Sequence, residues 1–323
     1  MRAAVYEAFG DPATVLTLGE RPMPEPRAGQ VRVRMVRSAI HNHDLWTVRG
    51  TYGARPKLPA IGGSEASGVV DALGEGVTHL RVGQRVTGFA SGTWAEFFVT
   101  SADALLPLPD SISDDLACQL VAMPLSAMAL LDHYKAGPGE WLVQNAANGA
   151  VGKTLATIAK ARGTQVVHLV RSDAGVAKLA AIGIEGAIST ADIGWQDRVT
   201  ALVGEGKVVT AIDSVGGGAS AELAWLLSPG GKLVAFGSMS GEPLAIDAGV
   251  LIFRAITVEG FWLTTHPISP ERRVAMISEL VALVASKALE LPVAGVFPLA
   301  EAAKAASANA VPNREGKVLL RGD

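Results

Sequence analysis

The clearest candidate for chemistry in this sequence is a short glycine-containing turn at residues 147–152. The apolar stretch Trp141–Ala147 before it is typical of a buried strand, and the segment after it has the periodicity of an amphipathic helix. In such a turn the backbone can approach the pyrophosphate of a dinucleotide, and the positive end of the helix faces the phosphates. Ala147 replaces the first glycine of the GxGxxG pattern. The turn still predicts a dinucleotide site, with contacts from Asn148, Gly149, Ala150, Val151 and Gly152.

The residues that follow the second strand indicate which nicotinamide cofactor is used. An acidic residue at that point would hold the ribose 2′-hydroxyl group of NAD. Here the strand TQVVHLVR ends in Val170-Arg171-Ser172, and an arginine can pair with the 2′-phosphate of NADP. Asp173 lies past the strand end, where it fits a helix N-cap or a first helical turn. We therefore predict NADPH, with Arg171 and Ser172 among its contacts.

The elements that must position these residues alternate between strands and helices from about residue 116. TQVVHLVR, VVTAIDSV and KLVAFGS are short apolar strands, and VAKLAAIG is one of the helical patterns between them. Such a βαβ series implies a parallel, doubly wound sheet. The first hundred residues favour β structure instead, since VRVRMVRSAI (Val31–Ile40) alternates apolar and basic residues and glycine and proline clusters break up the rest. We therefore predict an α/β protein in which a small irregular barrel precedes a doubly wound domain.

Composition and charge exclude several classes of protein. The 323 residues include 28 basic and 31 acidic side chains, a balance that does not suit a nucleic-acid-binding protein. One cysteine, Cys118, excludes an intramolecular disulfide framework and a four-cysteine zinc site. The longest apolar stretch, Leu116–Leu131, is shorter than the roughly 20 residues of a membrane span, and the first residues lack the apolar core of a signal peptide. We expect a cytoplasmic protein with no membrane or nucleic-acid partner.

Two local patterns point to a known family. GGSEASGVV (Gly62–Val70) is similar to the GHExxGxV motif of the medium-chain dehydrogenase/reductase superfamily, and AANGAVG is similar to its AxxGxVG turn. The resemblance covers essentially the whole chain. It implies a GroES-like β-barrel catalytic domain at 1–115 and 258–323, and a Rossmann NADP-binding domain with a doubly wound parallel sheet at 116–257. It also implies a homodimer, commonly formed through edge strands of the Rossmann sheets.

The zinc-dependent members of this superfamily carry Cys-His-x-Asp, a GHE motif and a loop with four structural cysteines. The corresponding segments here are His41-Asn42-His43-Asp44 and Gly63-Ser64-Glu65. His41 and Glu65 could ligate a metal ion, but Ser64 is a poor ligand and no third thiol or imidazole is placed. We expect no metal, with His41 and His43 lining the cleft or bonded to the backbone. Without a Lewis acid to polarise an alcohol oxygen, reduction of an activated carbon–carbon double bond is the expected chemistry.

Three further segments narrow the resemblance: RGTYG (Arg49–Gly53), QNAANGAVG (Gln144–Gly152) and VLIFRAITVEGFWLTTH (Val250–His266). They are similar to QGNYG, NA(A/S)NSGVG and LIFK…GFWLS of the mitochondrial-type trans-2-enoyl thioester reductases, in the same order and spacing. Two departures lie near the expected cleft. The Asn-Pro-Ser-Asp of those enzymes is His-Asn-His-Asp here, and their GNE triplet is Gly63-Ser64-Glu65.

The resemblance implies a mechanism and roles for individual residues. Hydride from NADPH adds to the β-carbon of an α,β-unsaturated thioester, and Tyr52, at the position of the family's catalytic tyrosine, stabilises or protonates the resulting enolate. Ser126 takes the position of a threonine that holds the nicotinamide end of the cofactor, and Asp44 that of a family aspartate. Further cofactor contacts are expected from Asp213, Phe236, Gly237, Ser238, Phe261 and Trp262, and a substrate pocket from His41, His43, Tyr52, Trp94 and Trp262.

Other interpretations of the same residues stay open. Any one of the aromatic side chains could serve core packing, Tyr52 could pack a loop, and Asp44 could be a buried structural acid. The leading function is NADPH-dependent reduction of an enoyl thioester carried by coenzyme A or acyl carrier protein. A zinc-independent NADPH:quinone or enone oxidoreductase is the alternative, followed by a zinc-type alcohol dehydrogenase. A non-catalytic NADPH-binding protein would be a different class, because fold and cofactor binding would be unchanged.

Overall fold

The computed structural model describes residues 1–312 and 314–322, and the chain divides into two compact units. The first unit comprises Met1–Ala122 and Leu280–Asp323, and the second comprises Met123–Glu279. In this division the segment 116–122 belongs to the first unit and the segment 258–279 to the second, opposite to the expected assignment of both. The expected domain limits themselves stay a prediction.

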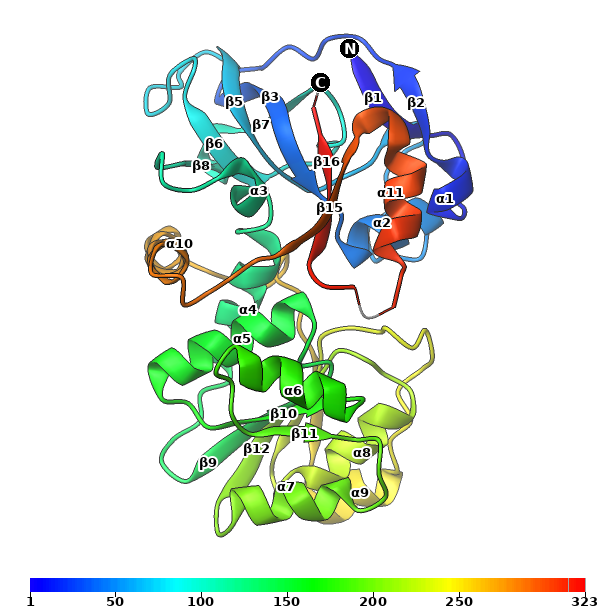
Figure 1. Cartoon of the computed structure of the whole chain (residues 1–323), viewed down its shortest axis with the longest axis vertical. Helices are drawn as coiled ribbons and strands as arrows, with labels where there is room; N and C mark the ends of the chain where they lie inside the picture. Colours follow the sequence, from blue (N-terminus) through cyan, green and yellow to red (C-terminus); the bar gives the residue numbers. More distant parts are fainter. Residues whose placement is uncertain (313, 323) are drawn as a thin grey trace. The chain divides into compact units, whose positions relative to one another are not determined.

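The first unit is built on two sheets (Figure 1). One small sheet places β1 (Arg2–Tyr6) between β2 (Thr17–Glu20) and β4 (Ala60–Ile61). The larger sheet has the order β15-β16-β3-β5-β6-β8, and β7 pairs with β3 off this path. Its strands are β3 (Gln30–Ala39), β5 (Glu65–Leu73), β6 (Arg85–Phe89), β7 (Phe97–Ser101), β8 (Leu105–Pro107), β15 (Val293–Pro298) and β16 (Lys317–Arg321).

The long strand β3 follows directly from the alternating sequence pattern. Val31, Val33 and Met35 are buried in the core of the first unit, and the arginines between them point away from it. Arg32, for example, forms an ion pair with Asp71 of β5 at 2.6 Å. The antiparallel pairing of β16 with β3 joins the end of the chain to this unit, as the sequence suggested.

Short helices complete the first unit. They are α1 (Pro12–Val15), α2 (Asn42–Arg49), α3 (Asp114–Ala117) and α11 (Ala302–Asn309), with 3₁₀ turns at η1 (Ala102–Ala104) and η2 (Leu299–Glu301). Gly50 ends α2 with a φ of 75°, a left-handed conformation that glycine adopts without strain. The chain therefore turns sharply after α2, and this turn sets the place of Tyr52.

The second unit is a six-stranded sheet whose strands all pair in parallel, in the order β11-β10-β9-β12-β13-β14. The strands are β9 (Glu140–Gln144), β10 (Val166–Val170), β11 (Ala187–Ser189), β12 (Lys207–Asp213), β13 (Lys232–Ala235) and β14 (Thr257–Gly260). This confirms the predicted doubly wound sheet. The strand order reverses between β9 and β12, and ligands of open α/β sheets bind beyond the carboxyl ends of the strands at such a point.

The helices that connect these strands are α5 (Ala150–Arg162), α6 (Asp173–Ala181), α7 (Trp195–Val203), α8 (Gly218–Leu226) and α9 (Ala248–Arg254), and α5 to α8 pack on the sheet (Figure 1). Helix α4 (Ala122–His133) precedes β9, and α10 (Pro270–Ala285) follows β14. Helix α5 ends at Gly163, whose φ of 68° is the left-handed conformation of a glycine C-terminal cap. No helix in the described part of the chain has both the length and the apolar character that crossing a membrane requires.

The start of α5 depends on a close backbone contact that can be tested. A Cβ at Gly152 would lie 2.6 Å from both Cα and O of Ala147, so the turn would have to move. We predict that Gly152→Ala lowers the free energy of unfolding by about 1–3 kcal/mol. The matched control is Gly218→Ala at the start of α8, where no atom lies within 4 Å of an added Cβ. Denaturant unfolding should show no loss for this control, and equal losses in the two variants would contradict the prediction.

Candidate functional site

Two buried ionisable side chains, His41 and Glu65, form a pair in the first unit. His41 is the N-cap of α2, and Glu65 is the first residue of β5. His41 Nε2 lies 2.8 Å from Glu65 Oε2, and neither side chain has exposed surface. Glu65 Oε1 accepts a hydrogen bond from Val121 N at 2.5 Å. The pair therefore joins three segments that are distant in the sequence.

Burial controls the protonation of this pair. It raises the pKa of Glu65 from 4.5 to about 8, although hydrogen bonds from backbone N–H groups act against the shift. Burial also lowers the pKa of His41, and the nearby positive charge of Lys317 adds to this effect. The pKa of Lys317, the first residue of β16, is itself lowered by burial to about 8. Both shifts within the pair favour uncharged Glu65 and uncharged His41, joined by a hydrogen bond.

His43 and Tyr52 lie beside this pair. His43 Nε2 is 2.7 Å from Ser64 Oγ and 3.5 Å from Asp44 Oδ1. The His43 ring stacks on the His41 ring at a centroid distance of 5.1 Å, and on the Tyr52 ring at 5.6 Å with an interplanar angle of 28°. The structure thus brings together the motifs at 41–44 and 63–65 and the expected catalytic tyrosine. We name this group, His41, His43, Tyr52, Ser64 and Glu65, the polar half-site.

Two residues expected to line the substrate pocket are instead in the interior of the first unit. Trp94 is fully buried in its apolar core, and its indole covers Gly62 and Gly63 so closely that an added Cβ would come within 2.2 and 2.3 Å of it. His41 is also fully buried and is bonded to Glu65. In these positions neither side chain can contact a substrate, so this expectation was wrong for both. A large ring gains more from complete burial than from lining a cleft.

Asp44 has a local structural role. It is 4% exposed, and its Oδ2 accepts a hydrogen bond from His41 N at 2.8 Å. A carboxylate in the first turn of a helix satisfies a free backbone donor and interacts favourably with the helix dipole. These contacts favour the buried structural acid among the two interpretations, and the expected contact with the cofactor stays a prediction.

The glycine-containing turn of the second unit has the form that a dinucleotide phosphate requires. It connects the end of β9 to α5, and no side chain caps the first turn of that helix. The buried side chain of Gln144 holds the turn in place, since its Nε2 donates to Gly152 O at 2.9 Å and lies 2.8 Å from His168 Nδ1. Burial lowers the pKa of His168 to about 4, which keeps this ring neutral and able to accept the bond. The sequence interpretation missed Gln144 and His168.

Asp213 anchors the loop that follows β12, at the point where the strand order reverses. Its side chain is fully buried, and its Oδ1 accepts hydrogen bonds from Asn145 Nδ2 at 2.7 Å and from the N–H groups of Val215 and Gly216 at 2.8 and 3.0 Å. Oδ2 accepts a bond from Ser220 Oγ at 2.6 Å. We expect Asp213 to act by shaping this loop. Asn145 was missed, although its place directly after β9 was a signal that could have found it.

Arg171 and Ser172 occupy the position at which the two nicotinamide dinucleotides are distinguished. They directly follow the end of β10, and both are exposed. Ser172 is the N-cap of α6, and its Oγ accepts a hydrogen bond from Gly175 N at 3.3 Å. Asp173 is the first residue of α6, so the expectation of a first-turn acid is confirmed. The residues present therefore fit a cofactor that carries a 2′-phosphate, and the individual contacts stay predictions.

The loop after β13 lies against the loop after β12. Phe236 N and Gly237 N both donate to Asp213 O, at 2.9 and 3.0 Å, and an added Cβ at Gly237 would lie 2.7 Å from Ser214 O. Ser238 is exposed beyond this contact, whereas Ser126, in α4, is buried. The roles expected for these residues toward the nicotinamide stay predictions.

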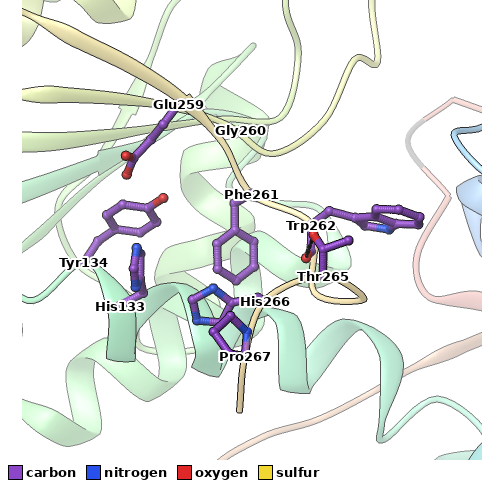
Figure 2. Close-up of a pocket in the computed structure, with 9 residues that line it drawn as sticks. All are labelled: His133, Tyr134, Glu259, Gly260, Phe261, Trp262, Thr265, His266 and Pro267. Atoms are coloured by element: carbon purple, nitrogen blue, oxygen red, sulfur yellow. Dashed lines mark hydrogen bonds between the residues drawn. The ribbon is translucent and has the colours of Figure 1, made fainter.

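Phe261 and Trp262, both expected to contact the cofactor, differ in their surroundings. Phe261 is 6% exposed and packs against His266 at a centroid distance of 4.7 Å, within a cluster that also contains His133 and Tyr134. This cluster borders a cavity of about 200 Å³ (Figure 2). Trp262 is 38% exposed, and its indole extends away from the cluster in Figure 2. Of the two, only Trp262 has substantial surface to offer a ligand.

The side chains at the expected metal positions do not fit a zinc site. His41 and Glu65 bond to each other, and Ser64 bonds to His43. Within residues 1–312 and 314–322, no group of three or more His, Cys, Asp or Glu side chains is arranged to hold a metal ion. We therefore derive no chemical step through zinc, and zinc independence stays a prediction.

Comparison with known proteins agrees with this geometry. A family model described as "Alcohol dehydrogenase GroES-like domain" matches residues 27–110, and one described as "Zinc-binding dehydrogenase" matches residues 150–285. The chain is 32% identical to "Enoyl-[acyl-carrier-protein] reductase, mitochondrial" of Homo sapiens, over 99% of this chain and 88% of that protein. The chain belongs to the medium-chain dehydrogenase/reductase superfamily.

Solved structures of this superfamily have the same fold. The quinone oxidoreductase of Pseudomonas syringae pv. tomato DC3000 matches with a TM-score of 0.89 and 27% identity, over 99% of each chain. The quinone oxidoreductase of Escherichia coli, solved with NADPH, matches with a TM-score of 0.89 and 26% identity, over 99% of this chain and 100% of that one. The predicted combination of a GroES-like domain and a Rossmann-type sheet is therefore confirmed, as is a medium-chain reductase at the level of the family.

Two expectations are not decided by family membership. The enoyl reductases that the chain resembles are named as mitochondrial proteins, so the expected cytoplasmic location stays a prediction. The expected homodimer also stays a prediction.

The raised pKa of Glu65 predicts a stability that depends on pH. Folded protein keeps a proton on Glu65 up to a pKa of about 8, whereas the unfolded chain releases it near 4.5, so wild-type stability falls as pH rises between these values. Glu65→Gln lacks this contribution. Relative to the variant, wild type should lose up to about 1.4 kcal/mol per pH unit between about pH 5 and pH 8. Denaturant unfolding across this range measures the slope.

The control is Glu75→Gln, which changes an exposed acid in the same unit and should show no such slope. If the difference in the free energy of unfolding between wild type and Glu65→Gln does not change with pH in this range, Glu65 is ionised in the folded protein.

Proposed function

We propose that this protein is an NADPH-dependent reductase of the carbon–carbon double bond in α,β-unsaturated acyl thioesters. The observation that carries the proposal is the 32% identity to the human mitochondrial enoyl-[acyl-carrier-protein] reductase over 99% of the chain. The retention of Tyr52 within the polar half-site supports it. An enoyl group on coenzyme A or on acyl carrier protein is the proposed substrate.

The second unit would hold the cofactor. When bound, NADPH supplies the hydride. The uncapped first turn of α5 presents backbone N–H groups and the positive end of the helix dipole, which suit a pyrophosphate. The exposed guanidinium of Arg171 is suited to a 2′-phosphate, and Ser172 lies beside it. The presence of NADPH in the structurally similar E. coli quinone oxidoreductase supports this choice.

The first unit would supply the acid. Hydride addition at the β-carbon leaves negative charge on the thioester oxygen, and a positioned donor lowers the energy of that charge. A phenol is a hydrogen-bond donor at neutral pH, so Tyr52 can donate a hydrogen bond to this oxygen and then a proton toward the α-carbon. Exchange with water restores the phenol.

Trp262, with its partly exposed indole, is suited to contact the acyl chain.

A second candidate function is reduction of quinones or simple enones. It is favoured by the TM-scores of 0.89 to two quinone oxidoreductases, and by the departures at His41, His43 and Ser64 from the thioester reductase pattern. Both functions use the same hydride and differ in whether a tyrosine must act on the product anion.

Removal of the Tyr52 hydroxyl group distinguishes the two functions. We predict that Tyr52→Phe lowers kcat for a trans-2-enoyl-CoA by about 100-fold or more, because the donor to the developing enolate is lost. NADPH consumption with enoyl-CoA, an ortho-quinone and an enone measures this. Tyr134→Phe is the control, since its hydroxyl group bonds to Glu259 and lies in the other unit. Preference of wild type for the quinone, with Tyr52→Phe unaffected, would overturn the thioester proposal.

The proposed cofactor choice makes a separate prediction. Arg171→Ala should raise the KM for NADPH by about 10- to 100-fold, the value of a charge-assisted hydrogen bond, and leave the KM for NADH unchanged. Lys207→Ala removes an equal charge at the start of β12, the opposite end of the sheet from Arg171, and should change neither value. Steady-state kinetics with both cofactors decides, and a parallel rise in both KM values would contradict a 2′-phosphate contact.

A further inference from the structure

The two departures from the enoyl thioester reductase pattern contact each other. His43 replaces the serine of the first motif, and Ser64 replaces the asparagine of the second. Their side chains, 21 residues apart in sequence, meet at 2.7 Å between Nε2 and Oγ. The neighbouring pair repeats this arrangement, since Glu65 bonds to His41 at 2.8 Å. Two consecutive residues therefore each hold one histidine at the start of α2.

This double attachment fixes a stack of rings that reaches Tyr52. The His41 and His43 rings are nearly parallel, with an interplanar angle of 13°, and His41 has no exposed surface and is tied to Glu65. The His43 side chain is only 16% exposed, and its ring also stacks on Phe89 at a centroid distance of 6.4 Å. Tyr52 stacks on the same imidazole. The orientation of the Tyr52 ring is thus linked to groups that the core holds in place.

The backbone of Tyr52 is attached to α2 by a hydrogen bond from its N–H group to Trp46 O at 3.2 Å, but this bond does not fix the orientation of the ring. Thr51 and Gly53 on either side are both exposed, and no atom lies within 4 Å of a Cβ added at Gly53. A phenol on such a segment needs side-chain contacts to keep its hydroxyl group in one place. Misplacement of a catalytic group by about 1 Å can cost about 100-fold in rate.

We propose that His43, held by Ser64, is a positioning residue for Tyr52. This inference rests on the proposed function, in which the Tyr52 hydroxyl group acts on the substrate. The imidazole supports one face of the phenol ring, and the hydrogen bond to Ser64 prevents the imidazole from rotating. Two charged groups act on this ring: Asp44, which lies 3.5 Å from the same Nε2 and is itself bonded to His41 N, and the buried Lys317.

Kinetics in two backgrounds tests the inference. His43→Ala should lower kcat for a trans-2-enoyl-CoA by about tenfold, and His43→Phe, which keeps a planar ring, by about threefold or less. Ser64→Ala alone should lower kcat by about threefold. Combined with His43→Phe it should lower kcat no further, since the hydrogen bond between residues 43 and 64 is then already absent. In the Tyr52→Phe background His43→Ala should have no further effect. The control is His79→Ala, an exposed histidine of the same unit.

Fluorine NMR gives a readout that needs no turnover. The chain has three tyrosines, so 3-fluorotyrosine labelling gives three signals, and Tyr52→Phe assigns one of them. His43→Ala should shift the Tyr52 signal, because the ring current of the imidazole is removed, and Ser64→Ala should shift or broaden it. The Tyr134 signal, from the other unit, should not change.

The possible failures are distinguishable. Absence of thioester turnover by wild type overturns the proposed function, and the fluorine shifts then still decide whether His43 orients Tyr52. If wild type turns over the thioester but His43→Ala lowers kcat by the same factor in the wild-type and Tyr52→Phe backgrounds, the inference alone is overturned. His43 then has a merely structural role. A Tyr52 signal that moves in neither variant overturns it as well.

Discussion

Glu65 carries a carboxyl group that has no access to water, and this constraint organises the first unit. A buried carboxyl group must be neutralised or hydrogen-bonded. Burial favours the protonated, neutral form of Glu65, and His41 and the N–H group of Val121 supply the hydrogen bonds. Those contacts require the start of α2, the start of β5 and the segment before α4 to meet at one point. His43 and Tyr52 follow His41 along the chain, so their positions depend on the same contact.

The second unit also contains a buried acidic side chain, that of Asp213. Its carboxylate is buried at the end of a central strand, and four protein donors surround it. Two of these donors are backbone N–H groups of the following loop. The hydrogen bonds that satisfy the Asp213 side chain therefore also shape this loop, at the point where the strand order reverses. Gln144 has a comparable role at the glycine-containing turn between β9 and α5, because its side chain bonds to Gly152 O and His168. In both units, buried polar groups hold in place the segments from which function is proposed.

The pattern of the sequence predicted some of these features correctly. The alternation in Val31–Ile40 predicted β3, the helical periodicity after the glycine-containing turn predicted α5, and the βαβ series predicted the doubly wound sheet. It failed for Trp94 and His41, which were expected at a substrate pocket and are fully buried. A single sequence position does not reveal which face of a segment the core will cover, and a polar or aromatic residue near a motif can point either way. It also missed Asn145, Gln144 and Lys317, whose importance depends on partners elsewhere in the chain.

By itself the sequence determined the fold class, the place of the dinucleotide turn and the superfamily, because each of these depends on local periodicity or on residues that are close together in the chain. Only the tertiary structure decided that His43 meets Ser64, that His41 meets Glu65 and that Tyr52 stacks on His43. The two histidine contacts join the start of α2 to residues 21 and 24 positions apart from them in the sequence, just before and at the start of β5. They form because burial of a carboxyl group and an imidazole is tolerated only where each finds the other, and that requirement is met by the folded core as a whole.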